Sequence, residues 1–378
     1  MLLTADARGV FPIAPTPFFE DGRIDTASVD RLTDFYLGIG ATGITVLGQL
    51  GEAPKLEHAE SVAVARRMIR RAAQLPVVVG VSAPGFAAMR ALTHEVMTAG
   101  AAGVMIAPPH TLRSDDQIVG YYRQAVQAIG ADVPFVLQDY PLTFSVQMSP
   151  GVIRRIVSEL PSCVMLKHED WPGLEKISTL RGWEREGAMR HIAILCGNGG
   201  LFLDYEMERG ADGANTGYAF PDMLCDVVRL SQAGQREEAH DLFDAHLPLL
   251  RYEQQPGVGL AVRKYVLMRR GLLASASQRQ PAALLDLLRH AQAEGVAAGS
   301  RPERHGQDAV AGPGDIQHCR QPDQHGRRIG VADLAHQDTR LQLFAPKAQV
   351  CADLLRELAV GLMEDRVGEI LRPQPHLL

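Results

Sequence analysis

Short apolar segments alternate with longer amphipathic segments along the first 230 residues of the chain. The apolar segments are rich in Val, Ile and Leu without strict alternation, which is typical of strands covered on both faces. The segments between them repeat apolar residues at helical spacing. The pattern predicts strands over 10–14, 43–48, 77–81, 103–107, 133–138, 163–168, 192–196 and 213–217. It predicts helices over 24–37, 57–75, 86–99, 117–129, 150–160, 174–186, 201–209 and 222–233.

This alternation predicts an α/β fold built on one parallel sheet. Eight strand–helix units in roughly 230 residues match a closed (β/α)8 TIM barrel better than an open sheet. We therefore expect a barrel over residues 1–230 and a C-terminal helical extension over 231–275, with helices at 236–252 and 258–270. From 276 to 378, Gln, His, Arg, Gly and Pro replace the apolar pattern. That composition predicts a poorly ordered tail with a weak helix over 349–371.

Composition narrows the class of protein. The net charge is −6 and no basic stripe precedes the tail, which argues against a nucleic-acid partner. No apolar run is long enough to span a bilayer, and the N-terminus lacks the pattern of a signal peptide. The five cysteines form no CxxC pair, so neither a disulfide framework nor a zinc site is expected. These features together predict a cytoplasmic protein without a membrane partner.

Lys167 is the most informative candidate residue. It ends the apolar run 163–168 in a chain with only five lysines, whereas arginine supplies most of the positive charge. Burial at a strand end should lower the pKa of the amine. A neutral amine in a pocket can attack a carbonyl and form a Schiff base. The alternative is a lysine that extends its ammonium group from the strand end into solvent.

The carboxyl ends of barrel strands converge on one mouth, so other strand ends can contribute to the same site. Tyr140 follows the fifth strand, and its phenol can both donate and accept a proton. For every strand end considered, the alternative to a role in the site is a structural one: a βα turn, a residue packed at the rim of the barrel, or a glycine turn. The candidates for substrate binding are Gln49, Leu50 and Gly51 after the second strand, His110 after the fourth, and Gly197 and Asn198 after the seventh.

Several motifs in order give the chain a family resemblance. They are the opening segment 12–18, the Gly48-x-x-Gly51-Glu52 loop, Tyr140 before a proline, Lys167 on its strand, Gly197-Asn198, and the final helices through Lys264. On these motifs, from about residue 10 to residue 274, the chain resembles the dihydrodipicolinate synthase / N-acetylneuraminate lyase family of class I aldolases. The resemblance implies that Lys167 forms the Schiff base with a 2-oxo acid such as pyruvate. It also implies that Tyr140 relays protons, that the Gly48–Glu52 loop holds the carboxylate, and that the protein is a homo-oligomer, either a tetramer or a dimer.

The chain departs from that family at three places. Gln49 and Leu50 stand where the family commonly has two hydroxyl residues. Residues 108–110 replace a tyrosine of the dihydrodipicolinate synthases, and residues 142–146 contain no arginine for the carboxylate of their aldehyde substrate. We therefore expect an aldolase or dehydratase of 2-oxo acids, such as 2-keto-3-deoxy sugar acids, rather than a true dihydrodipicolinate synthase.

The expected mechanism requires no metal and no organic cofactor, because the iminium serves as the electron sink. His110, His168 and Glu169 could be imagined as metal ligands, but their spacing fits no known pattern. The changed loop at Gln49 and Leu50 leaves one alternative function open. In that alternative, the barrel binds a 2-oxo acid without turning it over, because a fold by itself does not determine activity.

Overall fold

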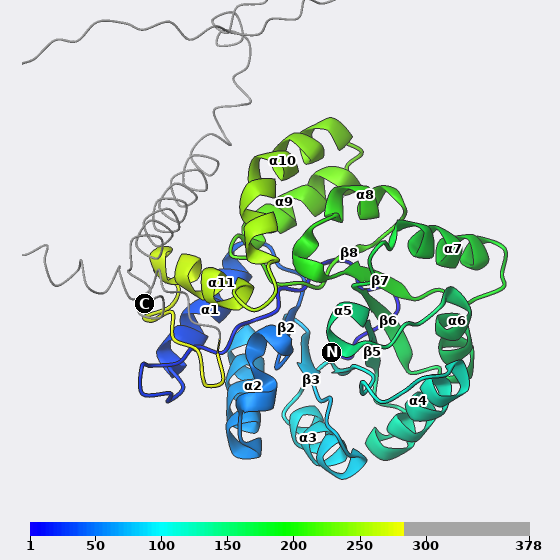
Figure 1. Ribbon diagram of the computed structural model, residues 1–378, viewed down its shortest axis with the longest axis horizontal. Coiled ribbons are helices and arrows are strands. Elements are labelled where there is room, and N and C mark those ends of the chain that lie inside the picture. The colour runs from blue at the N-terminus through cyan, green and yellow to red at the C-terminus, as the bar shows by residue number, and fades with distance from the viewer. Residues whose placement is uncertain (283–378) are drawn as a thin grey trace, which may run out of the picture. The chain divides into compact units, whose positions relative to one another are not determined.

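The computed structural model describes residues 1–282, which lie within one compact unit, Met1–Leu285. Eight parallel strands form its centre and the helices surround them (Figure 1). The strands are β1 Gly9–Val10, β2 Ile44–Val46, β3 Val77–Gly80, β4 Gly103–Ile106, β5 Phe135–Asp139, β6 Cys163–His168, β7 Ala193–Cys196 and β8 Gly213–Ala214. The sheet order is β1-β8-β7-β6-β5-β4-β3-β2, which confirms the predicted (β/α)8 barrel.

Hydrogen bonds between β2 and the segment that follows β1 bring the two ends of this sheet together. Ile13 and Thr45 form an isolated parallel bridge, and Thr45 N–H donates to the carbonyl of Pro12 at 2.9 Å. The strand expected over 10–14 is shorter in the structure because prolines at 12 and 15 have no N–H to donate to a ladder. Even so, Phe11 and Ile13 donate to carbonyls at the end of β8, so the segment still follows the barrel wall.

Helices follow the strands at nearly the predicted bounds. They are α1 Thr26–Gly38, α2 His58–Ala72, α3 Phe86–Thr98, α4 Asp115–Ile129, α6 Pro150–Glu159, α7 Leu174–Arg185, α8 Leu203–Glu208 and α9 Pro221–Gln232. Short helical turns, η1 Gln49–Gly51, η2 Ala53–Lys55, α5 Pro141–Phe144 and η3 Asn198–Gly200, lie in the loops after β2, β5 and β7. Asp25 and Ser114 cap α1 and α4 by accepting backbone N–H groups, as residues at these positions commonly do.

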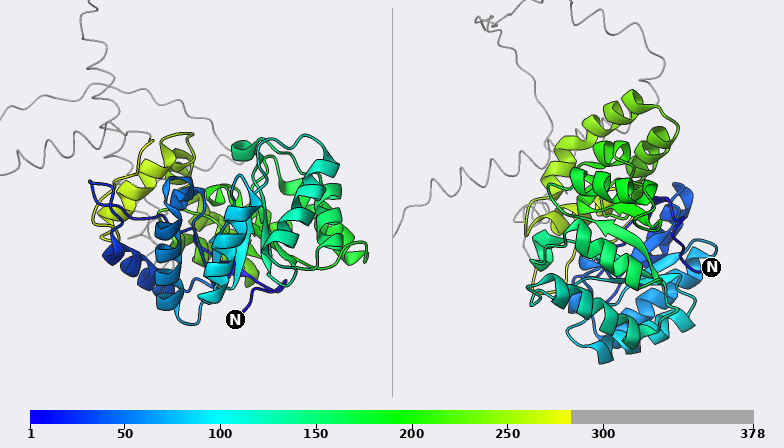
Figure 2. Two further views of the ribbon diagram at one scale, coloured as in Figure 1. Left: turned by 90° about the horizontal axis from the view of Figure 1, so that it is seen from below. Right: turned by 90° about the vertical axis from the view of Figure 1, so that its right-hand side faces the viewer.

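The C-terminal helices α10 Arg236–Glu253 and α11 Gly259–Arg269 belong to the same compact unit as the barrel. Both figures show α11 beside α1 (Figures 1 and 2), and Arg270 stacks over the Phe35 ring at 5.0 Å. The domain limits expected at residues 230 and 275 stay predictions. None of the helices within residues 1–282 has the length and apolar character needed to cross a membrane.

The first residues of the expected tail pack against the barrel. Arg279 pairs with Glu60, and its backbone N–H donates to Glu52 at 3.1 Å. Ala276 is buried. The ion pair of Arg279 and the burial of Ala276 therefore attach the start of the expected tail to the barrel. The rest of the expected tail, including the helix over 349–371, lies outside the described residues.

Candidate active site

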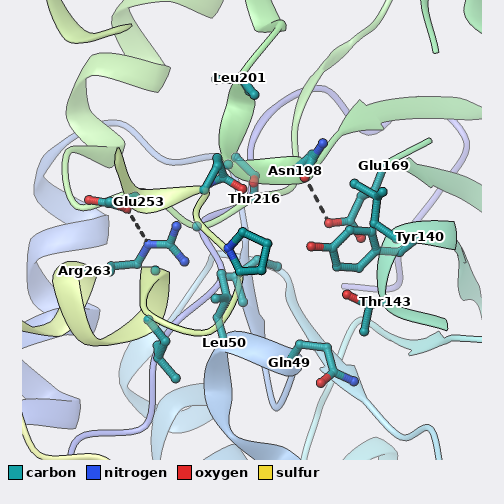
Figure 3. A pocket seen from close by; sticks show the side chains of 18 of the residues that line it. Gln49, Leu50, Tyr140, Thr143, Glu169, Asn198, Leu201, Thr216, Glu253 and Arg263 are labelled. Atoms are coloured by element: carbon teal, nitrogen blue, oxygen red, sulfur yellow. Dashed lines mark hydrogen bonds and ion pairs between the residues drawn. The ribbon is translucent and has the colours of Figure 1, made fainter. Parts of the chain in front are cut away.

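A cavity of about 680 Å³ lies at the carboxyl ends of the strands. Strand ends on opposite sides of the barrel contribute to its wall, together with the two C-terminal helices (Figure 3). Its polar lining residues include Gln49, Gln138, Tyr140, Thr143, Lys167, Glu169, Asn198, Thr216, Arg251, Glu253, Gln254, Gln255 and Arg263. Of the residues expected at the site, Lys167, Tyr140, Gln49, Leu50 and Asn198 line this cavity.

Lys167 points into the barrel mouth and is only 5% exposed. It follows Met165 by two residues on β6, and alternate residues of a strand share a face. Met165 belongs to the buried cluster that contains Phe11, Met105 and Leu195, so this face of β6 is the inner one. The Lys167 Nζ lies 2.9 Å from Glu169 Oε1. The amine therefore has a buried ion-pair partner and does not reach into solvent.

Glu169 is the most important residue that the sequence analysis did not place in the site. Besides Lys167, it accepts hydrogen bonds from Gln138 Nε2 at 2.8 Å and from the backbone N–H of Asn198 at 3.2 Å. The side-chain period of two could have identified it, because it follows Lys167 by two residues in the direction of β6. A carboxylate held by three donors is fixed next to the amine and can accept a proton from it.

Gly197 contributes space rather than a wall of the cavity. A Cβ atom at this position would come within 2.2 Å of Glu169 Cγ. Its N–H donates to the His168 carbonyl at 2.7 Å. The glycine therefore lets the loop after β7 approach Glu169 closely, which brings the Asn198 N–H onto the carboxylate.

Tyr140 follows β5 and immediately precedes α5. In Figure 3 its ring lies beside Glu169 and Thr143. Burial raises the pKa of the Tyr140 phenol, and the negative charge of Glu169 raises it further. A hydrogen bond with Thr143 and the positive charge of Arg263 lower the pKa of the phenol. The phenol is therefore protonated at neutral pH and can donate a proton.

The loop after β2 lines the cavity with Gln49 and Leu50 but not with Gly51. Gly51 is buried, its N–H donates to the Gly48 carbonyl at 3.0 Å, and its carbonyl accepts from Thr16 Oγ1 at 2.6 Å. The Gly51 N–H is therefore already satisfied within the loop. Leu50 contributes only apolar atoms from its side chain.

His110 lies away from the cavity. The residue is exposed, it does not line the cavity, and its carbonyl accepts a hydrogen bond from the Arg113 side chain. The loop after β4 turns outward at this point, so the expectation that His110 contacts the substrate finds no support in its position. Within residues 1–282, no three His, Cys, Asp or Glu side chains lie close enough together to hold a metal ion. His110, His168 and Glu169 therefore do not form such a group.

The opposite wall of the cavity carries a buried ion pair that the sequence analysis missed. Arg263 Nε donates to Glu253 Oε2 at 2.8 Å, and the two residues are 2% and 3% exposed. They come from α11 and α10. In the sequence they resemble ordinary charges on amphipathic helices. Only the packing of these helices against the barrel brings them to the cavity.

A second buried charge cluster lies behind Lys167. Residues Asp139 and His168 are register partners on β5 and β6, facing away from Lys167. Lys176 Nζ of α7 donates to Asp139 Oδ2 at 2.7 Å and also pairs with Asp170. Burial raises the pKa of Asp139 to about 7 and lowers the pKa of His168 to about 4. The cluster ties α7 to the two strands that carry Tyr140 and Lys167.

Comparisons with known proteins identify the family of this chain. The model of the dihydrodipicolinate synthetase family matches residues 6–296. An L-2-keto-3-deoxyarabonate dehydratase of Azospirillum brasilense is 29% identical over 279 residues, which cover 72% of this chain and 88% of that protein. A 4-hydroxy-tetrahydrodipicolinate synthase of Sorangium cellulosum is 32% identical over 247 residues, which cover 64% of this chain and 78% of that protein.

Solved structures extend the comparison. A crystal structure of a dihydrodipicolinate synthase from Rhodopseudomonas palustris is 66% identical, with a TM-score of 0.75. The match covers 79% of this chain and 99% of that one. The family model, these relatives and the shared barrel place this chain in the dihydrodipicolinate synthetase family.

Proposed function

We propose that this protein is a class I lyase that forms a Schiff base between Lys167 and a 2-oxo acid. The observation that carries the proposal is the buried amine of Lys167, which lines a cavity at the barrel mouth with Glu169 Oε1 at 2.9 Å. Tyr140 lines the same cavity. A nucleophile beside a proton acceptor is the arrangement that covalent catalysis by an amine requires.

The proposed reaction begins when Glu169 takes a proton from the Lys167 ammonium group. The neutral amine then adds to the keto carbon, and water leaves to give the iminium. A proton leaves the carbon next to the iminium, whose nitrogen accepts the electron pair, and an enamine forms. In a dehydratase the enamine then expels the hydroxyl group on the following carbon, which departs as water after Tyr140 or Glu169 protonates it. Hydrolysis of the imine releases the product and restores the lysine.

An aldolase would use the same first steps but break a carbon–carbon bond. In that case the hydroxyl group on C4 of the iminium loses its proton, and the bond between C3 and C4 breaks. C4 becomes the carbonyl carbon of the released aldehyde, and the electron pair of the broken bond forms the enamine. We favour dehydration of a 2-keto-3-deoxy sugar acid. Glu169 gives the site a carboxylate that can act as an acid or base, and the Azospirillum brasilense relative is named for such a dehydration. The cavity volume of about 680 Å³ lies in the range of small-molecule sites.

The Rhodopseudomonas palustris relative carries a different name, dihydrodipicolinate synthase. In this chain the loop over 142–146 contains no arginine, and His110 is exposed in the loop after β4. Without an arginine, the loop over 142–146 cannot bind the carboxylate of an aldehyde substrate as the dihydrodipicolinate synthases do. We therefore keep the sugar-acid substrate as the proposal.

A panel of 2-keto-3-deoxy sugar acids tests this function. We expect the full-length protein to consume at least one of them, with loss of water rather than release of pyruvate. Lys167→Met should abolish the reaction, whereas Arg23→Met, at a residue with a 76% exposed side chain, should not change it. Pyruvate release in place of dehydration would show an aldolase. If no 2-oxo acid were consumed and none bound covalently, the protein would be a binding member of the family without turnover.

We further propose that the protein works in the cytoplasm as a homo-oligomer of two or four copies. The absence of cysteine pairs in the sequence and the family membership support this proposal.

A further inference from the structure

Arg263 is held rigidly at the wall of the cavity opposite Lys167. Its Nε donates to Glu253 Oε2 at 2.8 Å, and Glu253 Oε1 accepts the backbone N–H of Ala219 at 3.3 Å. Both side chains are almost fully buried. In Figure 3, Glu253 lies behind the guanidinium group, on the far side from Tyr140 and Glu169. The planar group is therefore oriented before any ligand arrives.

One arm of this guanidinium has no partner. Within residues 1–282, Arg263 Nη1 is buried and makes no hydrogen bond. An arginine stays charged in proteins, and leaving a buried charged donor unsatisfied is costly. Since Arg263 lines the cavity, the missing acceptor is best supplied by a ligand that enters it.

Arg263 Nη1 lies near Leu50, one of the two residues that replace the usual hydroxyl residues in the loop after β2. A Cβ atom at Gly217 would lie 2.3 Å from Leu50 Cδ1 and 3.1 Å from Arg263 Nη1. Leu50 Cδ1 therefore occupies the space beside Gly217 that a side chain would need, and the free arm of Arg263 lies next to it. The side chain of Leu50 cannot donate a hydrogen bond, and the Gly51 N–H is used within the loop.

We infer that Arg263 binds the carboxylate of the 2-oxo acid through its free Nη1, in place of side-chain donors on the loop after β2. This inference rests on the proposed function, because it assigns a binding role within the same cavity. Hydrogen bonds between a guanidinium group and a carboxylate are charge-assisted and stronger than neutral ones. Arg263 would thus make the site selective for 2-oxo acids over uncharged ketones.

Cyanoborohydride trapping of the imine with pyruvate and with hydroxyacetone tests this role, since only pyruvate carries a carboxylate. Replacing Arg263 alone would leave Glu253 buried and unpaired, so the test variant is Arg263→Gln with Glu253→Gln. We expect its half-saturating pyruvate concentration to rise by roughly 10- to 100-fold, as for a lost charged hydrogen bond. Trapping of hydroxyacetone should stay nearly unchanged. Arg269→Gln, at an exposed residue of the same helix, is the control.

The possible results distinguish a failure of the proposed Schiff-base function from a failure of the role assigned to Arg263. If the wild type traps neither ketone, the proposed function fails. If the wild type traps pyruvate and the double variant keeps the same preference for pyruvate over hydroxyacetone, the function stands and the role of Arg263 is overturned. Should the double variant fail to fold, Arg263→Lys replaces it, because lysine keeps the charge near Glu253 but lacks the second arm. An unchanged preference in that variant would equally overturn the inference.

Discussion

Glu169 changes the chemistry expected at the reactive lysine. A buried lysine alone would have to lose its proton through desolvation, whereas the Glu169 carboxylate lies 2.9 Å from Nζ and can take that proton directly. Gln138 and the Asn198 N–H hold the carboxylate in place. Gly197 makes room for it. The four residues come from three neighbouring strand ends, and their combined effect is a fixed acid–base group.

Glu169→Gln should therefore reduce turnover by roughly 100- to 10,000-fold, the usual contribution of a general acid–base group. The amide cannot accept the proton from Lys167, but it keeps the size of the side chain, so the fold should persist. Steady-state kinetics on the best 2-oxo acid substrate measure the loss. Glu175→Gln, at a residue with an 83% exposed side chain, is the matched control. Equal turnover in the two variants would remove Glu169 from the mechanism.

At the scale of elements, β6 carries two separate charge clusters on its two faces. Lys167 lies on the inner face, and His168 lies on the outer face opposite Asp139 of β5. Lys176 of α7 supplies the positive charge for Asp139, whose second oxygen has no partner among the described residues. The helix is therefore attached to the strands by a buried ion pair directly behind Lys167.

Lys176→Met should destabilise the protein by about 3–5 kcal/mol at pH 8, the usual cost of breaking a buried pair. Burial raises the pKa of Asp139 to about 7, above its ordinary value of 3.8, and losing Lys176 raises it further. The folded state then binds more protons than the unfolded state above pH 3.8, so stability falls as the pH rises through this window.

Denaturant unfolding should show that Lys176→Met loses less stability relative to the wild type at pH 5 than at pH 8. Adding Asp139→Asn should remove most of that difference, and a loss independent of pH would contradict this assignment.

The sequence predicted the elements well where one physical pattern dominates. The strand predicted over 163–168 matches β6 because an apolar run ends there in charged residues. The strand ends of a parallel barrel converge, which is why Lys167, Tyr140, Gln49, Leu50 and Asn198 could be expected at one cavity. Arg263 and Glu253 could not be expected there, because their place depends on how α10 and α11 pack. The outward turn of His110 likewise depends on loop geometry that apolar periodicity does not encode.

The C-terminal helices α10 and α11 line the cavity and also belong to the compact unit of the barrel. Lys264 of α11 is fully buried, pairs with Glu52 of the loop after β2, and donates to the Ser277 carbonyl at 2.9 Å. Burial lowers the pKa of Lys264 to about 8. The helix that brings Arg263 to the cavity is thus fixed to the loop that carries Gln49 and Leu50.

The full chain should assemble into a closed homo-oligomer, since most soluble oligomers are symmetric assemblies of one chain. Light scattering coupled to size-exclusion chromatography should give two or four times the chain mass of 41.1 kDa. A mass of one chain at every concentration would contradict this prediction.

Locating the covalent adduct tests directly whether Lys167 forms the Schiff base. The full-length protein is treated with pyruvate and cyanoborohydride, digested, and analysed by peptide mass spectrometry. We expect one stoichiometric adduct on Lys167, and none on any lysine of Lys167→Met. An unmodified Lys167, or an adduct of equal yield on another lysine, would contradict this expectation.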